Sequence, residues 1–146
     1  MRRRDLLGTV PAALLPAGCL GDAPVADAGV ALVDADLRVL EAECGRQVAA
    51  DASVDPDAPS VTVDGTVRGA DLCHTARLRG ATYDPGADLL TVHVVAVSET
   101  GTPCGQCIAE IDYTATCAFA GGLPGRVRVV HGTGDRRTVV TTVTLS

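Results

Sequence analysis

Lysine, asparagine and tryptophan are absent from the sequence, and aromatic residues are nearly so. All 12 basic residues are arginines, and 18 acidic residues give the chain a formal net charge of −6. Nucleic-acid binding requires a basic face, so this balance argues against a nucleic-acid partner. Only Tyr83, Tyr113 and Phe119 carry a phenyl or phenol ring, too few for a surface on which carbohydrate rings stack. The single methionine is Met1, which argues against a copper site with an axial methionine.

The acidic residues are mostly aspartates, fourteen against four glutamates. An acidic chain without lysine is typical of extreme halophiles, in which a carboxylate-rich surface stays hydrated in concentrated salt. A GC-rich genome would also favour arginine over lysine. We keep both interpretations of the arginine bias.

Residues 1–18 are predicted to be a signal peptide rather than part of the fold. Three arginines at positions 2–4 precede an apolar run from Leu6 to Leu15. This run is too short to span a bilayer. The sequence RRDLL at positions 3–7 resembles the twin-arginine export motif, and LPAGC at positions 15–19 resembles a lipobox, although Pro16 stands where leucine is usual.

The lipobox resemblance implies cleavage before Cys19 and acylation of its thiol. Acyl chains would hold the protein at the outer face of the cell membrane without a spanning helix. An ordinary secretory signal peptide followed by a chance cysteine is the alternative. Residues 19–35 are rich in alanine, aspartate, glycine and proline and lack clear periodicity, which predicts a flexible tether.

Residues 36–146 are predicted to form one all-β domain. Short apolar runs rich in valine and threonine are separated by turn sequences such as Asp84-Pro85-Gly86. This spacing, without long amphipathic helical segments, favours a small antiparallel β-sandwich, immunoglobulin-like, of seven to eight strands. The predicted strands cover residues 36–44, 47–54, 60–68, 74–83, 89–97, 107–119, 126–131 and 137–145.

The stretch from Cys104 to Phe119 carries three of the six cysteines and the clearest alternation in the chain. From Cys107 onward the odd positions are apolar and the even positions are mostly polar, which predicts a half-buried central strand. Glu110 and Asp112 fall on the polar side, where we expect them to face solvent rather than to act as a catalytic pair.

If Cys19 is acylated, five cysteines remain, enough for two disulfides and one free thiol. Cys117 is the expected free thiol, because it lies on the apolar face of the central strand. The favoured pairing joins Cys44 and Cys73 each to one member of the pair Cys104 and Cys107. The competing pairing, Cys104–Cys107 with Cys44–Cys73, would suit a thiol–disulfide oxidoreductase, but the expected helix after a redox Cys-x-x-Cys is missing.

Other chemistry has little support in the sequence. Cys73, His74, Cys104 and Cys107 offer zinc-type ligands, but adjacent strand residues point to opposite faces, so we predict no metal site. His74, His93 and His131 are scattered and are expected to be exposed or at a rim. We recognise no catalytic constellation and predict no cofactor and no enzyme.

Five segments resemble a family of haloarchaeal secreted lipoproteins: Gly69–Cys73, Thr75–Leu78, Tyr83-Asp84, Cys104–Phe119 and Gly121–Pro124. Members of this family have no assigned activity, so the resemblance implies a compartment and a fold class but no reaction. The sequence therefore predicts a lipid-anchored β-sandwich that serves as a binding or structural module of the cell envelope. The alternative is an envelope oxidoreductase using Cys104 and Cys107.

Overall fold

The computed structural model of the chain describes residues 29–100, 104–105 and 107–145. The predicted signal peptide, Cys19 and most of the predicted tether lie outside these residues. Within the described ranges no helix is long and apolar enough to cross a membrane.

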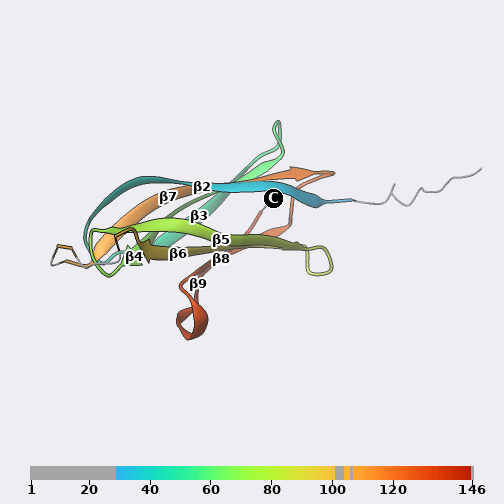
Figure 1. Cartoon of the computed structure of the whole chain (residues 1–146). Coiled ribbons are helices and arrows are strands. Elements are labelled where there is room, and N and C mark those ends of the chain that lie inside the picture. The colour runs from blue at the N-terminus through green and yellow to red at the C-terminus, as the bar shows by residue number, and fades with distance from the viewer. Residues whose placement is uncertain (1–28, 101–103, 106, 146) are drawn as a thin grey trace, which may run out of the picture.

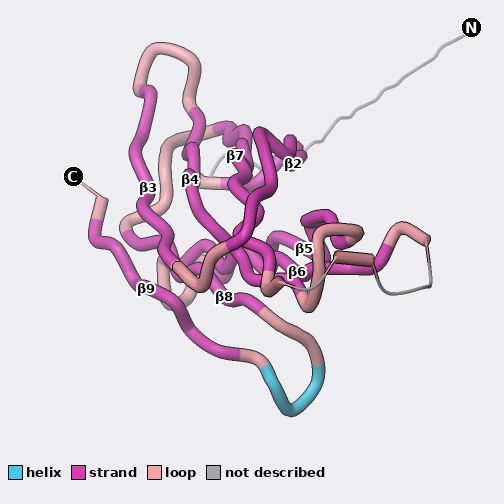
Figure 2. Tube along the Cα trace, turned by 90° about the vertical axis from the view of Figure 1, so that its left-hand side faces the viewer, coloured by secondary structure: helices cyan, strands magenta, loops and turns pink. Residues whose placement is uncertain are grey.

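The domain is a sandwich of two four-stranded sheets, as the sequence predicted (Figure 1). The first sheet has the order β2 (Ala31–Cys44), β7 (Ala109–Ala120), β4 (Ser60–Gly69) and β3 (Ala49–Asp55). The second has the order β5 (His74–Asp84), β6 (Leu89–Ser98), β8 (Arg126–His131) and β9 (Thr138–Thr144). A short 3-10 turn, η4 (Gly134–Arg136), lies in the projecting connection between β8 and β9 (Figure 2).

The two layers were predicted correctly, whereas the order of the strands within them, which differs from that of an immunoglobulin domain, was not specified by the sequence. β6 and β8 also form a parallel pair, with Leu89 opposite Arg126, whereas the sequence predicted antiparallel pairing. The reason is the path of the chain. β7 ends beside the turn where β6 begins, so the chain enters the second sheet at the start of β6 and runs in the same direction.

β2 begins at Ala31, five residues before the predicted start of the domain. Residues 31–35 therefore belong to the strand and not to the tether. They pair with the C-terminal end of β7, from Ala31 opposite Ala120 to Ala35 opposite Cys117. Pairing with a strand already fixed in the sheet orders a segment whose composition alone predicted a linker.

β7 is the central strand of the first sheet, hydrogen-bonded to β2 on one side and β4 on the other. Its odd-numbered residues are buried from Ala109 to Phe119, and its even-numbered residues are partly or fully exposed, as the alternation predicted. Ile111 and Tyr113 pack against a valine-rich layer from the second sheet, including Val92, Val94 and Val129. Each fully buried aliphatic side chain contributes about 1.5–3 kcal/mol, so valines supply what the few aromatic rings do not.

The outer face of the first sheet carries like charges in register. Acidic residues lie directly opposite each other on neighbouring strands in three places: Glu43 and Glu110, Glu41 and Asp112, and Asp51 and Asp64. Like charges at such positions destabilise a sheet. Salt screens exposed charges, so the fold should be more stable in concentrated salt than in dilute buffer.

We therefore predict that Asp51→Asn raises the free energy of unfolding in dilute buffer by about 0.2–1 kcal/mol. The gain should shrink in concentrated potassium chloride, where the repulsion from Asp64 is already screened. Urea titration at several salt concentrations measures both effects. Asp57→Asn is the matched control, because Asp57 lies in the turn between β3 and β4 with no acidic residue paired to it. Equal effects of the two substitutions would show that cross-strand repulsion is not the cause.

Candidate functional site

Two disulfides lie at one end of the sandwich and join three segments distant in sequence. Cys44, the last residue of β2, pairs with Cys107, and Cys73, just before β5, pairs with Cys104. The Cα–Cα distances are 5.6 and 5.7 Å, within the usual range for disulfides. We call these two bridges the clasp. Both end in the segment that leads into β7, so the clasp ties β2 and the start of β5 to the central strand.

This pairing is the one that the sequence favoured. It leaves Cys104 and Cys107 in different bridges, although they are only three residues apart. Cys117 is the free thiol and is fully buried in the core. Burial, reinforced by the carboxylates of Asp36 and Asp34, raises the pKa of this thiol to about 11. Because the thiolate is the reactive form, Cys117 is a packing residue rather than a nucleophile.

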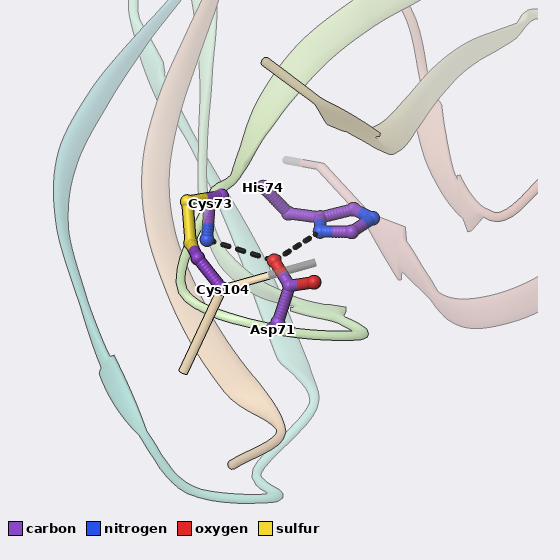
Figure 3. The surroundings of a disulfide bond; sticks show 4 residues. All are labelled: Asp71, Cys73, His74 and Cys104. Carbon is purple, nitrogen blue, oxygen red and sulfur yellow. Dashed lines mark hydrogen bonds and ion pairs between the residues drawn. A yellow bond between two sulfur atoms is a disulfide. The ribbon is translucent and has the colours of Figure 1, made fainter. Parts of the chain in front are cut away.

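Asp71 organises the loop beside the Cys73–Cys104 bridge. Its Oδ1 accepts hydrogen bonds from the backbone N–H of Cys73, at 2.8 Å, and from Nδ1 of His74, at 3.0 Å (Figure 3). The bonds from His74 and then Cys73 hold the pKa of Asp71 below its usual value. Figure 3 shows the imidazole of His74 turned away from the disulfide, so its Nε2 edge is directed away from the sulfur atoms. Asp71 thus fixes the orientation of His74.

The structure does not assemble the zinc-type set that the sequence offered. Cys107 is bonded to Cys44, so it cannot join Cys73, His74 and Cys104. Asp71, Cys73 and Cys104 do bring three ligand-type atoms within 4.8 Å of one another. Both sulfur atoms are consumed by the disulfide, whereas a metal requires thiolates. We therefore assign the cluster a structural role.

A cavity of about 610 Å³ opens next to this loop, at the clasp end of the sandwich. The ends of β4 and β6, the start of β5 and the connection between β8 and β9 form its walls. Its apolar lining includes Val48, Val67, Val95 and Val140. Its ionisable lining residues are Arg68, His74, His131 and Arg136. The cavity therefore combines an apolar surface with basic groups only.

His131 is buried, with 6% of its surface exposed, so the expectation of an exposed or rim position was wrong. Its Nε2 lies 2.7 Å from the hydroxyl of Tyr113. Gly65 leaves room for that hydroxyl, because a Cβ at position 65 would collide with it. A hydrogen bond from β7 therefore offsets the cost of burying an imidazole. His74 and His93 are partly buried, and His93 Nε2 bonds to the carbonyl of Gly132.

Burial changes the pKa values of Tyr113 and His131. It raises the pKa of Tyr113 and, together with nearby His93, lowers the pKa of His131 to about 4. Tyr113 and His131 are therefore both neutral at pH 7. The phenol has one proton to donate and the imidazole has one lone pair, so the hydrogen bond between them needs no charge.

The acidic pair of the central strand has local partners. Glu110 accepts a hydrogen bond from the backbone N–H of Gln47, and Asp112 accepts one from the hydroxyl of Thr66, each at 2.7 Å. Both carboxylates lie on the outer face of the first sheet and not in the cavity. They stabilise neighbouring strands, and the geometry gives them no shared reacting position.

Sequence reasoning missed the roles of Asp71, Tyr113 and Arg136. Asp71 had a usable signal, because an aspartate two residues before a backbone N–H commonly accepts from it in an Asx turn. The Tyr113–His131 contact and the place of Arg136 at the cavity had none, since each depends on how the two sheets stack. Comparison with protein-family models, curated proteins and solved structures finds no match to this chain.

We predict that the domain loses stability as the pH falls from 6.5 to 4. His131 has a lowered folded-state pKa, so between these values the unfolded chain binds a proton that the folded domain does not. The stability that neutral His131 contributes is complete above pH 6.5 and is lost as the pH falls to 4. His131→Gln retains an acceptor for Tyr113 but cannot titrate, so its urea midpoint should change less across this range. An unchanged slope in the variant would contradict this account of His131.

We also predict that removing the Cys73–Cys104 bridge with the double substitution Cys73→Ala, Cys104→Ala costs about 2–4 kcal/mol of stability. The reason is that the unfolded chain regains the freedom that the bridge removed. Urea unfolding without reductant measures the loss, and adding reductant to the same variant should produce a second loss as Cys44–Cys107 opens. A variant as stable as the parent would show that the clasp does not hold the domain together.

Proposed function

We propose that this protein is a lipid-anchored module of the cell envelope that binds a ligand at the clasp end of its β-sandwich. The anchor is the acylated Cys19 that the lipobox resemblance implies. The clasp and the cavity would then face the exterior. The haloarchaeal lipoprotein resemblance and the acidic composition support an envelope protein. Neither of them identifies the ligand.

The geometric observation that carries this proposal is the placement of the cavity relative to the anchored end. β2 runs the length of the domain, from Ala31 opposite Ala120 to Cys44 opposite Ala109 (Figure 1). Fourteen residues of strand span about 45 Å. The chain enters the domain at Ala31, whereas the cavity lies beside Gly69 and His74, at the Cys44 end. A tether attached to a membrane would therefore hold the cavity away from the lipid.

The clasp supports an exported location, since disulfides form and persist in oxidising compartments. Two bridges around one end of a small domain suit an exported protein. The same bridges weigh against the oxidoreductase alternative. That activity needs Cys104 and Cys107 to exchange with each other, and each is paired with a distant cysteine instead. We therefore propose binding rather than thiol–disulfide exchange.

The anchor is tested by replacing Cys19. We expect Cys19→Ser to release the protein from the membrane into the medium or the soluble fraction, because the acyl chains attach through this thiol. Detergent phase partitioning and mass spectrometry of the N-terminal peptide measure the change. Cys117→Ser is the matched control, since it removes a thiol that has no part in anchoring. A Cys19→Ser protein that stays in the membrane fraction would contradict the lipid anchor.

A further inference from the structure

The charge of the cavity lining is opposite in sign to the net charge of the whole chain. The chain has a net charge of −6, yet no acidic residue lines the cavity, and two arginines and two histidines do. Asp135 is the chain neighbour of Arg136 but does not line the cavity, and two other acidic groups at this end of the sandwich have partners of their own. Asp71 bonds to His74 and to the backbone of Cys73. Glu110 lies opposite Arg68 in the sheet register but bonds to the backbone of Gln47.

The two arginines have no acidic partner among the residues that the structure describes. Arg136 lies in η4 and lines the cavity, whereas Arg68, near the end of β4, lies opposite Glu110 on the outer face of the sheet and borders the cavity only at its edge. A guanidinium is always charged and binds carboxylate or phosphate oxygens through paired N–H groups. A guanidinium in the lining, with no carboxylate there, favours an anionic ligand.

His131, which lines the cavity, adds a polar group without a partner. Nδ1 of His131 is buried and has no hydrogen-bond partner in the described part of the chain. If Tyr113 donates its hydroxyl proton to Nε2, the neutral imidazole carries its own proton on Nδ1. A buried N–H group without an acceptor is rare and marks a place where a water molecule or a ligand atom belongs. This donor has the same preference as the arginines, an oxygen acceptor.

Apart from Thr133 and Thr138, the remaining lining is apolar. Val48, Val67, Val95 and Val140 provide contacts for a hydrocarbon group, and about 610 Å³ lies in the usual range for small-molecule sites. Inorganic ions would leave this surface unused. The cavity therefore fits a molecule with one oxyanion group and one apolar part.

We propose that the cavity binds a small organic anion, with its carboxylate or phosphate held by Arg136 and its apolar part packed against the valines. This assignment rests on the proposed function in one respect, because it names the ligand class of the binding module. It requires no chemical change in the ligand.

Benzoate, phenyl phosphate and benzyl alcohol are suitable probes, because they share an aromatic ring and differ in charge. The exported chain is titrated with each by calorimetry in potassium chloride at one ionic strength. We expect at least one of the two anions to bind with a stoichiometry of one and benzyl alcohol to bind at least about tenfold more weakly, because it lacks the charge-assisted hydrogen bonds. Absence of binding by both anions, or equal binding of the alcohol, would overturn the proposal.

Arg136→Gln should weaken binding of the anion about tenfold, as expected for loss of one charge-assisted contact. Arg137→Gln is the matched control, since Arg137 is the next residue in the chain and does not line the cavity. Ala70→Tyr is a second test that keeps all four basic residues but fills part of the cavity, and it should also weaken binding. Equal affinities of the Arg136 and Arg137 variants, or full binding by Ala70→Tyr, would place the anion elsewhere.

These experiments test the lipid anchor and the anion site independently of each other. Loss of binding in a protein that still partitions with membranes would overturn the anion site alone. Retained binding in a protein that never associates with membranes would overturn the lipid anchor alone. The Cys19→Ser chain should bind the anion as tightly as the parent, because position 19 is distant in sequence from every residue lining the cavity.

Discussion

The covalent attachment of β2 and β5 to the segment before β7 is the constraint on which the clasp end depends. Cys44–Cys107 fixes where β2 leaves the first sheet, and Cys73–Cys104 fixes the loop that enters the second. Asp71 and His74 take their positions from that loop. Without the bridges, a valine-rich sandwich with few aromatic rings would hold its sheets together by modest apolar contacts alone. The position of this wall of the cavity therefore depends on the clasp.

The two sides of this protein use charge in opposite ways. The outer face of the first sheet places carboxylates against carboxylates, which favours water and salt at the surface over contact with a partner. The cavity gathers arginines and histidines, which favours an anion. In concentrated salt exposed charges are screened, whereas groups within a cavity are screened less. A halophilic setting would therefore leave recognition to the cavity.

The fold was largely predictable because strand periodicity and turn residues are local signals. The predicted ends of all eight strands lie within five residues of the ends in the structure. The disulfide pairing that the sequence favoured for Cys44 and Cys73 is the one in the structure. The strand order and the parallel pair β6–β8 were not predictable, because they depend on which end of the sandwich the chain crosses. The cavity was missed for the same reason. His131 looks like a rim residue in sequence, and only the stacking of β8 against β7 brings it to Tyr113.

Digestion with trypsin under non-reducing conditions, followed by mass spectrometry, tests the clasp most directly. Cleavage after arginine places Cys44 in the peptide 39–46, Cys73 in 69–77, and both Cys104 and Cys107 in 80–126. The structure predicts that these three peptides remain joined as one species, which separates on reduction. A species joining only 39–46 to 69–77, with 80–126 closed on itself, would contradict the clasp and restore Cys104–Cys107 as a redox pair.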